Sequence, residues 1–577
     1  MQNHRYRVCR FGCGHRARRR SLVVDQEFAR GWCCWSQKDW PSHSCVANYR
    51  RWSQRVRQQD RDPAAYPPKP SGVSSPVRRS GSDRQLKPDR ACTAANDDKG
   101  DPVSRKSGSR SVSWNALGLV SRQIVIVLSS VYLARILGPE SYGVITQAAI
   151  YTAFMTLLLD QGIASSLISL PRLTRRMSAA AISANLILAA ALATLTVFSA
   201  GPVSRFFHTP ELRAVLCVLG VGLLLKAGVL VPRVLLVRDM NFKSQAVGDG
   251  GGALVGALVA IVGALSGMDY WSLVLQIVVS DVVVLLVLAV AARPPMPSLR
   301  LRSLRGTWGF SIRVFFSNLL SFSVQNVDNI LIGRELGADS LAQYGLSYRV
   351  LTTPVQMIGQ VVTRVLFPVV ARGRADGVSV VPAVSRSVRG IALFSFPVMA
   401  AVSVSAHDLV PLLLGPAWTA AIPVLTILAI GGARQSVTTV NTSILMGMGL
   451  SSWLLRFSIV AATVQVTAIV VGLQFGIVGV AAGLTIAGFL LTPVVAWLSK
   501  RATGFDYGRQ IGCVGPPVHG SAWACITYLG ITQLLGNSAL GILVSLLGGL
   551  FVYVAVLAVV HRKFMKLCRS DISAMRP

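Results

Sequence analysis

Long apolar runs recur along the chain from residue 114 to residue 560. A helix needs about 20 apolar residues to cross the hydrocarbon layer of a bilayer, which is roughly 30 Å thick. Backbone groups inside lipid must be hydrogen-bonded within the protein, and runs of this length suit helices rather than barrel strands. Only 14% of the residues are charged. The sequence therefore predicts an all-α polytopic membrane protein.

We place about fourteen transmembrane spans on these runs. They are expected near residues 114–137, 143–165, 179–201, 212–236, 246–267, 271–292, 308–335, 342–369, 387–406, 419–446, 454–474, 477–499, 520–536 and 538–560. Lys and Arg accumulate in every second connection, as at Arg175 and Arg176 or Arg372 and Arg374. Because cytoplasmic loops are enriched in these residues, the alternation supports the count and predicts that both termini are cytoplasmic.

The chain contains an internal repeat. RILGPES at 135–141 recurs as RELGADS at 334–340, and VGALSG at 262–267 recurs as VGLQFG at 471–476. Six spans separate the copies, so both halves keep one orientation in the membrane. The repeat predicts two six-helix lobes related by a parallel repeat, with two further C-terminal helices. The Arg and Gly of the first pattern are typical of helix C-termini, so we expect them to have a structural capping role.

The predicted organisation has seven parts. They are a basic tail at 1–112, a first lobe with spans 1–6 at 113–292, a basic cytoplasmic linker at 293–307, a second lobe with spans 7–12 at 308–499, a cytoplasmic loop at 500–519, spans 13 and 14 at 520–560 and a basic cytoplasmic C-terminus at 561–577. We expect the tail to be a disordered extension. It would be translated upstream sequence, with the actual start of the protein near Val103 or Val112. Binding of RNA or anionic lipid by this tail is the less favoured alternative.

Composition and motifs exclude several function classes. The formal net charge of +33 would suggest nucleic acid in a soluble protein, but here it comes from the tail and the cytoplasmic loops. The Cys and His spacings of the tail match no common zinc pattern. The sequence has no nucleotide-binding glycine loop, and its membrane part has no nucleophile–base or metal-ligand constellation. We therefore expect no enzyme activity, cofactor, metal or nucleic-acid partner.

Several cations lie inside predicted spans, where a charge costs roughly 2.5–3.5 kcal/mol even on insertion scales. Lys226 and Arg434 lie near the middle of spans 4 and 10, and the repeat places them one position apart. Such cations favour a cavity that binds an anionic headgroup, although Asp281 in span 6 could pair with Lys226 and weaken this role. The other candidate cations for the same headgroup are Arg122, Arg313 and Arg364.

Two acid–base pairs are also predicted. Asp328 and Arg349 lie seven residues from the outer ends of spans 7 and 8, so antiparallel packing would place them at one depth. Arg122 and Asp160 fall at comparable depths in the inner half. Paired charges avoid an uncompensated burial cost. Two interpretations stay open, namely static ion pairs that hold the bundle, or carboxylates that exchange Arg for a proton or Na⁺.

Two sequence runs carry a family resemblance. VDNILIGRELGADSLAQYGLSYRVLTTPVQMIGQVVTRVLFPVVAR at 327–372 resembles the start of the second half of the polysaccharide transporter family, and VYLARILGPESYGVITQA at 131–148 resembles the end of its first helix. These are Wzx-type flippases of lipid-linked oligosaccharides, within the superfamily of multidrug, oligosaccharidyl-lipid and polysaccharide exporters. The resemblance covers roughly 113–495. It implies alternating-access export of an undecaprenyl-diphosphate-linked oligosaccharide across the bacterial cytoplasmic membrane, for lipopolysaccharide or exopolysaccharide biosynthesis.

Two other functions stay open at this point. A cation-coupled multidrug exporter of the same superfamily would share the fold, but the excess of cations over acids in the spans disfavours cationic drugs. A non-transporting scaffold of a polysaccharide assembly complex would not need buried charges. The expected partners are the lipid-linked oligosaccharide and membrane lipids, together with a polymerase and glycosyltransferases of the same pathway.

The basic tail provides a first test. Deleting residues 1–102 should leave membrane insertion and export intact, because nothing in this composition is suited to pack within or pair with a bilayer-spanning bundle. The measurement is export activity and the amount of membrane protein, compared with the full chain. Loss of export by the truncated protein at normal membrane levels would show that the tail takes part in transport.

Overall fold

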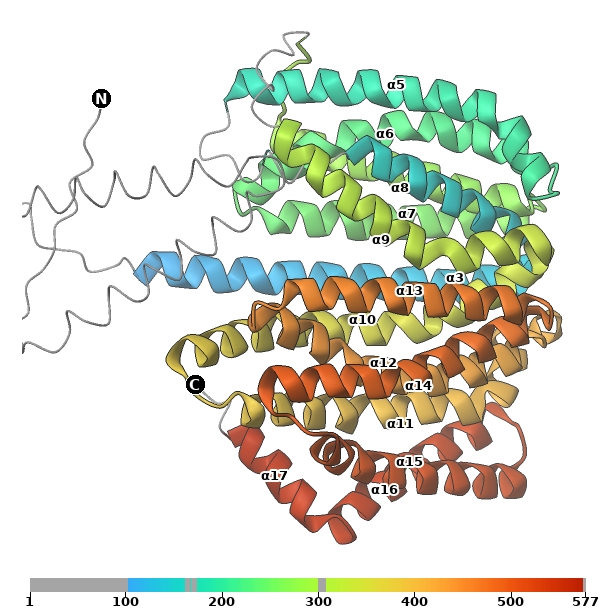
Figure 1. The fold of residues 1–577 in the computed structure, drawn as a ribbon. Coiled ribbons are helices and arrows are strands. Elements are labelled where there is room, and N and C mark those ends of the chain that lie inside the picture. The colour runs from blue at the N-terminus through green and yellow to red at the C-terminus, as the bar shows by residue number, and fades with distance from the viewer. Residues whose placement is uncertain (1–101, 161–166, 168–173, 299–307, 574–577) are drawn as a thin grey trace, which may run out of the picture. The chain divides into compact units, whose positions relative to one another are not determined.

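The structure is a computed structural model, and it describes residues 102–160, 167, 174–298 and 308–573. Within these ranges the regular elements are helices, and no strand occurs. The first helices are α3 (Pro102–Asp160), α5 (Arg175–Phe206), α6 (Leu212–Arg238), α7 (Phe242–Leu265) and α8 (Tyr270–Ala292) (Figure 1). Next come α9 (Trp308–Glu335), α10 (Gly337–Asp376), α11 (Val381–Leu414), α12 (Ala421–Gly447), α13 (Ser451–Leu473) and α14 (Gly476–Thr503). The last are α15 (Tyr507–Leu535), α16 (Ala539–Val559) and α17 (Arg562–Ser573).

The polytopic membrane class is confirmed. Ten helices in the described residues are long and apolar enough to cross a membrane, judged by length and composition. Residues 1–101 of the predicted tail lie outside the described residues. The last part of that tail is helical, because α3 begins at Pro102 rather than near residue 113. Proline is tolerated in the first helical turn, where its missing N–H has no intrahelical partner.

Glycines break the helices at the two repeated patterns. α3 is two helices joined across a kink at Gly138, which has φ +74°. Gly337 has φ +85° at the corresponding place before α10, and Gly267 and Gly476, the second repeated pair, have φ +81° and +69°. Only glycine adopts this left-handed region at no steric cost. Each repeated glycine therefore has a positive φ, as its copy does, which agrees with a structural role.

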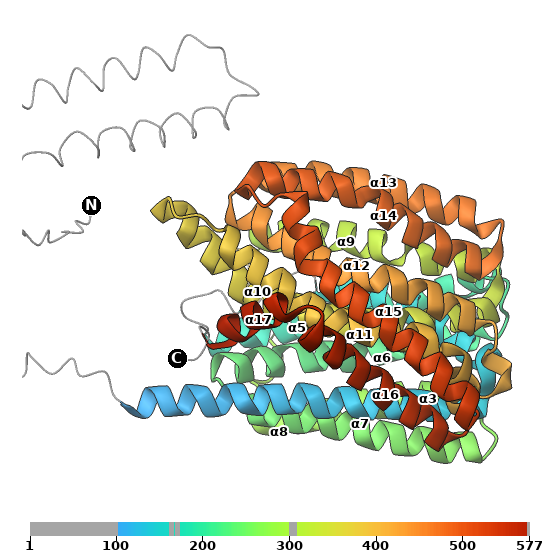
Figure 2. The same cartoon turned by 90° about the horizontal axis from the view of Figure 1, so that it is seen from below.

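The helices form two groups and a C-terminal appendage (Figures 1 and 2). In the first group α7 packs on α3 and α8, and α6 packs on α5 and α8. In the second group α12 lies against α10, α11 and α14, while α13 packs on α14. Helices α15 and α16 pair with each other and pack against α11. We call the two groups the N-lobe (α3–α8) and the C-lobe (α9–α14), in which α9 contacts α3 of the N-lobe as well as α10 and α13.

The lobes are joined at the end of the bundle marked by Gly138 and Gly337, here called the outer end. The fully buried Trp418 follows α11 in a short 3-10 turn, and its indole Nε1 donates to the carbonyl oxygen of Ala134 in α3 at 2.9 Å. The Gln147 amide of α3 donates to the carbonyl oxygen of Gly333 in α9 at 3.2 Å. One buried apolar cluster draws residues from both lobes here. At the opposite end, the described cluster around Val231 belongs to the N-lobe, and the one around Val388 combines the C-lobe with Phe505 and Cys513 of the C-terminal part, so neither joins the two lobes.

Gly143 allows the closest backbone approach between the lobes. A Cβ at this position of α3 would overlap the carbonyl oxygen of Ala338 in α10, a backbone atom that cannot move aside alone. Gly345 lies on the same helix pair, but a Cβ there would meet only Thr146 at an ordinary 3.5 Å. We call this packed junction of the two lobes at the outer end the outer seal. Its close packing depends on the absence of a side chain at Gly143.

We expect Gly143→Ala to lower the stability of the detergent-purified protein and Gly345→Ala to leave it unchanged or slightly raised. Gly to Ala inside a helix is otherwise favourable by about 1 kcal/mol, whereas overpacking costs about 1–3 kcal/mol. The measurement is the thermal melting midpoint of each variant. Equal shifts for the two substitutions would show that the lobes do not approach closely at Gly143.

Candidate functional site

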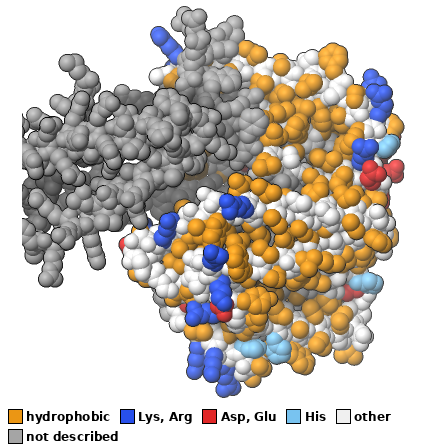
Figure 3. Space-filling view, in the orientation of Figure 1, with side chains coloured by type: hydrophobic (Ala, Val, Ile, Leu, Met, Phe, Trp, Pro, Cys, Tyr) orange, Lys and Arg blue, Asp and Glu red, His pale blue; other side chains and the backbone are white. Residues whose placement is uncertain are grey.

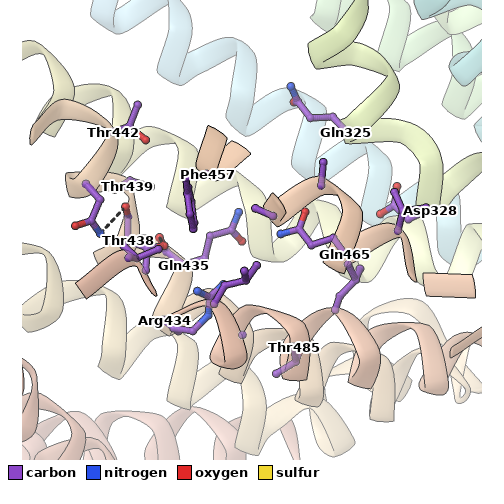
Figure 4. A pocket seen from close by; sticks show the side chains of 18 of the residues that line it. Gln325, Asp328, Arg434, Gln435, Thr438, Thr439, Thr442, Phe457, Gln465 and Thr485 are labelled. Atoms are coloured by element: carbon purple, nitrogen blue, oxygen red, sulfur yellow. Dashed lines mark hydrogen bonds between the residues drawn. The ribbon is translucent and has the colours of Figure 1, made fainter. Parts of the chain in front are cut away.

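A polar cavity of about 370 Å³ lies inside the C-lobe, between α9, α10, α12, α13 and α14. We call it the C-lobe cavity. Its polar walls are formed by Gln325, Asp328, Arg434, Gln435, Thr438, Thr439, Asn441, Thr442, Gln465 and Thr485. Figure 4 shows Arg434, Gln435 and Gln465 grouped along the cavity, with Asp328 at one end and Thr442 at the other. Residues 434, 438, 441 and 442 recur at helical spacing, so α12 presents one polar face to this space.

Arg434 is the cation of this cavity. Its side chain is half-buried, and its Nε is buried with no hydrogen-bond partner in the described structure. The guanidinium carbon lies 5.9 Å from the centre of the Phe489 ring in α14. Gly488 provides the space beside it, since a Cβ there would come within 2.5 Å of a guanidinium nitrogen. Among the described residues, no carboxylate forms an ion pair with Arg434.

Asp328 is the buried carboxylate of the cavity, with 5% of its surface exposed. Its Oδ2 accepts from the Tyr344 hydroxyl at 2.8 Å, and its Oδ1 accepts from the Asn329 backbone N–H at 2.8 Å. The Tyr344 ring stacks on Tyr348, which also lines the cavity, with centroids 5.8 Å apart. Neutral donors, rather than a cation, thus hold this carboxylate at the end of the cavity.

The predicted ion pair between Asp328 and Arg349 is not formed. Arg349 is exposed, and within the described residues the side-chain partner of Asp328 is Tyr344. Tyr344 and Tyr348 are four positions apart, so both lie on the face of α10 that meets α9. Arg349 follows Tyr348 directly, and one residue turns the helix by about 100°. The depth estimate matched the two charges along the membrane normal, but rotation about the helix axis separates them.

The two cations that the repeat predicts to be equivalent have different surroundings. Lys226 in α6 forms an ion pair with Asp281 in α8, with 2.9 Å between Nζ and Oδ2. This is the partner that the sequence suggested would weaken an anion-binding role for Lys226. Arg434 instead faces an open polar cavity. The C-lobe position is therefore the better candidate for contact with an anion.

The structure describes the side chains of only some of the remaining candidate residues. Arg122 is exposed about a third of the way along α3, and Asp160 is the half-buried last residue of that helix. The side chains of Arg313 and Arg364 lie outside the described residues.

Sequence reasoning missed the tyrosine and glutamine side chains of the cavity. The pair of tyrosines at i and i+4, on the helix after Asp328, is the signal that could have revealed them. Gln465 is the one amide side chain within α13, and a polar residue inside a span usually faces a cavity or a polar partner.

A family described as Polysaccharide biosynthesis protein matches residues 132–423. The chain is 24% identical to the succinoglycan biosynthesis transport protein ExoT of Rhizobium meliloti (strain 1021), over 82% of this chain and 97% of ExoT. It is also 24% identical to the lipopolysaccharide biosynthesis protein WzxC of Escherichia coli (strain K12), over 75% of this chain and 87% of WzxC.

Solved structures share the fold. The lipid II flippase MurJ in an inward closed conformation superposes with a TM-score of 0.60 at 12% identity, over 78% of this chain and all of MurJ. An inward-facing multidrug transporter of the MATE family superposes with a TM-score of 0.50 at 16% identity, over 67% of this chain and 95% of that one. At these identities the likeness concerns the fold alone.

The bond between Tyr344 and Asp328 should appear as an energetic coupling. We expect Tyr344→Phe to destabilise the protein by about 1.5–3 kcal/mol, because a hydrogen bond to a charged group is lost. In a protein that already carries Asp328→Asn, Tyr344→Phe should lower the unfolding free energy by less than it does in the wild type. The measurement is a double-mutant cycle on the apparent unfolding free energy in mixed micelles.

Arg349→Ala is the matched control for that cycle, because Arg349 lies on the same helix and is exposed. It should change stability by less than about 0.5 kcal/mol and add independently to Asp328→Asn. Strong coupling to Arg349 together with none to Tyr344 would contradict the arrangement described here.

Proposed function

The chain belongs to the polysaccharide biosynthesis protein family, and from this premise we propose that it is a flippase for lipid-linked oligosaccharides. It would move undecaprenyl-diphosphate-linked repeat units from the cytoplasmic to the outer leaflet of the bacterial cytoplasmic membrane. The names of ExoT and WzxC, a transport protein and a lipopolysaccharide biosynthesis protein, support this substrate class and a function without enzyme activity. A sugar–diphosphate headgroup cannot cross about 30 Å of hydrocarbon unaided.

The observation that carries the proposal is Arg434 in the C-lobe cavity. A cation deep in a bundle normally finds a carboxylate, because unpaired charge is costly there. Arg434 instead meets a polar space and lies over the ring of Phe489. A guanidinium binds phosphate oxygens in a bidentate manner. The Thr, Asn and Gln side chains beside it offer hydrogen bonds to phosphate or sugar hydroxyls.

We assign the coupling role to Asp328. A buried carboxylate held by neutral donors retains a free-energy cost that a proton or Na⁺ would remove. Asp328 and Arg434 line the same cavity, so binding of a proton or Na⁺ at Asp328 would change the electrostatic potential at Arg434. An inside-negative membrane potential also favours outward movement of an anion, by about 2.3 kcal/mol per charge per 100 mV.

The transport cycle proposed for these residues uses both lobes. The chain would cross the membrane fourteen times, with both termini in the cytoplasm. The two lobes would rock about the outer seal near Trp418. Lys226 would reach the headgroup by exchanging its Asp281 partner. Arg122, Arg313 and Arg364 would contact the headgroup from the inner half as it enters. Glycosyltransferases of the same pathway would supply the repeat unit, and a polymerase would consume it.

Arg434→Glu should abolish export while leaving normal amounts of protein in the membrane, since it replaces the cavity cation by an anion. Arg434→Lys should retain part of the activity, because the charge survives and the bidentate fork does not. The assay is transfer of lipid-linked oligosaccharide across the membrane in cells or vesicles, with membrane protein levels measured alongside.

Arg456→Glu is the matched control, because Arg456 is exposed near the beginning of α13 and does not line the cavity. It makes the same charge change and should export at close to the normal rate. Normal transfer by Arg434→Glu would rule out a cationic headgroup site in the C-lobe. Equal loss in both variants would point to net charge rather than to the cavity.

A further inference from the structure

A second pocket lies at the opposite end of the bundle from the outer seal. It has a volume of about 680 Å³ and lies between α11, α15 and the junction of α16 with α17. We call it the basic pocket. The cationic side chains that line it are Arg389, Arg509, Arg562 and Lys563, with His561 beside them. It shares no lining residue with the C-lobe cavity.

The short helix α17 covers this pocket and is held firmly in place. Phe564 and Cys568 are one turn apart and buried against Tyr553 and Leu557 of α16. Near its end, Asp571 binds two arginines of α11, Arg386 at 3.1 Å and Arg389 at 2.7 Å. The Lys and Arg of α17 point away from this apolar face, so the helix is amphipathic. Figure 3 shows basic side chains gathered at the edge of the bundle where α17 lies.

Three cations of the pocket keep an uncompensated charge. Arg389 is neutralised by Asp571. Arg509, Arg562 and Lys563 are exposed, and no ion pair to any of them is found among the described residues. Three unpaired cations around one hollow attract a multivalent anion, for which phosphate has the appropriate oxygens.

An apolar groove lies next to the basic pocket. It has a volume of about 570 Å³ and runs between α11, α15 and α16, with Met565 of α17 at one end. Its rims are open to the surroundings, since Phe394 is 67% and Leu550 is 53% exposed. Leu393 lines the groove and Arg389 lines the pocket, one turn apart on α11. The anion site and the apolar groove thus lie in line along the same helices.

We propose that the basic pocket binds the phosphate headgroup of an anionic phospholipid, and that one acyl chain of this lipid lies in the apolar groove. The lipid comes from the leaflet that surrounds this end of the bundle, which the distribution of Lys and Arg predicts to be the cytoplasmic one. Basic pockets between membrane helices on that side attract anionic headgroups. Free phosphate would satisfy the cations but would leave the groove unfilled. The bound lipid stabilises the packing of α15–α17 on α11.

The test uses the full chain, purified in detergent. Arg509→Gln with Lys563→Gln removes two of the unpaired cations from the pocket. Lys566→Gln with Arg569→Gln is the matched control, because it removes the same charge from exposed positions of α17 that do not line the pocket. Lipid bound after purification is measured by native mass spectrometry, and the melting midpoint is measured with added phosphatidylglycerol, phosphatidylethanolamine or inorganic phosphate.

Wild type and control should retain phosphatidylglycerol and melt at a higher temperature when it is added. The pocket variant should bind it more weakly, on the order of tenfold or more, given the contribution of each basic residue near a charged headgroup. Equal weakening in the control would show that general charge attraction is responsible and overturn the site. Equal binding of phosphatidylethanolamine, or equal stabilisation by inorganic phosphate, would overturn an anionic phospholipid as the ligand.

Discussion

A charged side chain inside a membrane-spanning bundle must be compensated by an opposite charge, by hydrogen-bond donors or by water. The protein uses a different means at each of three positions. Lys226 has the carboxylate of Asp281, and Asp328 has the Tyr344 hydroxyl and a backbone N–H. Arg434 has an open polar cavity and the space left by Gly488. The proposed function depends on this third solution, because only a cation without a fixed partner is available to a passing anion.

In the proposed transport cycle, the lobes would move about the contacts that join them. Trp418 and Gln147 join the lobes at the outer end through hydrogen bonds to backbone carbonyls, and Gly143 lets two helices approach closely. Because α12 and α14 carry the cavity and belong wholly to the C-lobe, rotation would carry Arg434 without rebuilding its surroundings.

The C-terminal helices form a separate structure with its own electrostatics. Asp571 ties α17 to α11, and the remaining cations of the basic pocket are left without partners. Since α11 also leads into the turn that carries Trp418, a lipid bound at one end of this helix lies on an element that forms the seal at the other end.

The sequence by itself determined the membrane class, the helical architecture and the left-handed glycine turns, because apolar run length and glycine chemistry are local properties. It also identified Asp281 as the possible partner of Lys226. The sequence predicted a cavity for both Lys226 and Arg434, but only the tertiary structure decided that Arg434 faces one while Lys226 is paired. Only the tertiary structure decided, too, that Asp328 binds Tyr344 rather than Arg349. Counting residues along a span gives a side chain's depth in the membrane. Its direction around the helix axis, and the neighbour it meets there, depend on how the helices pack.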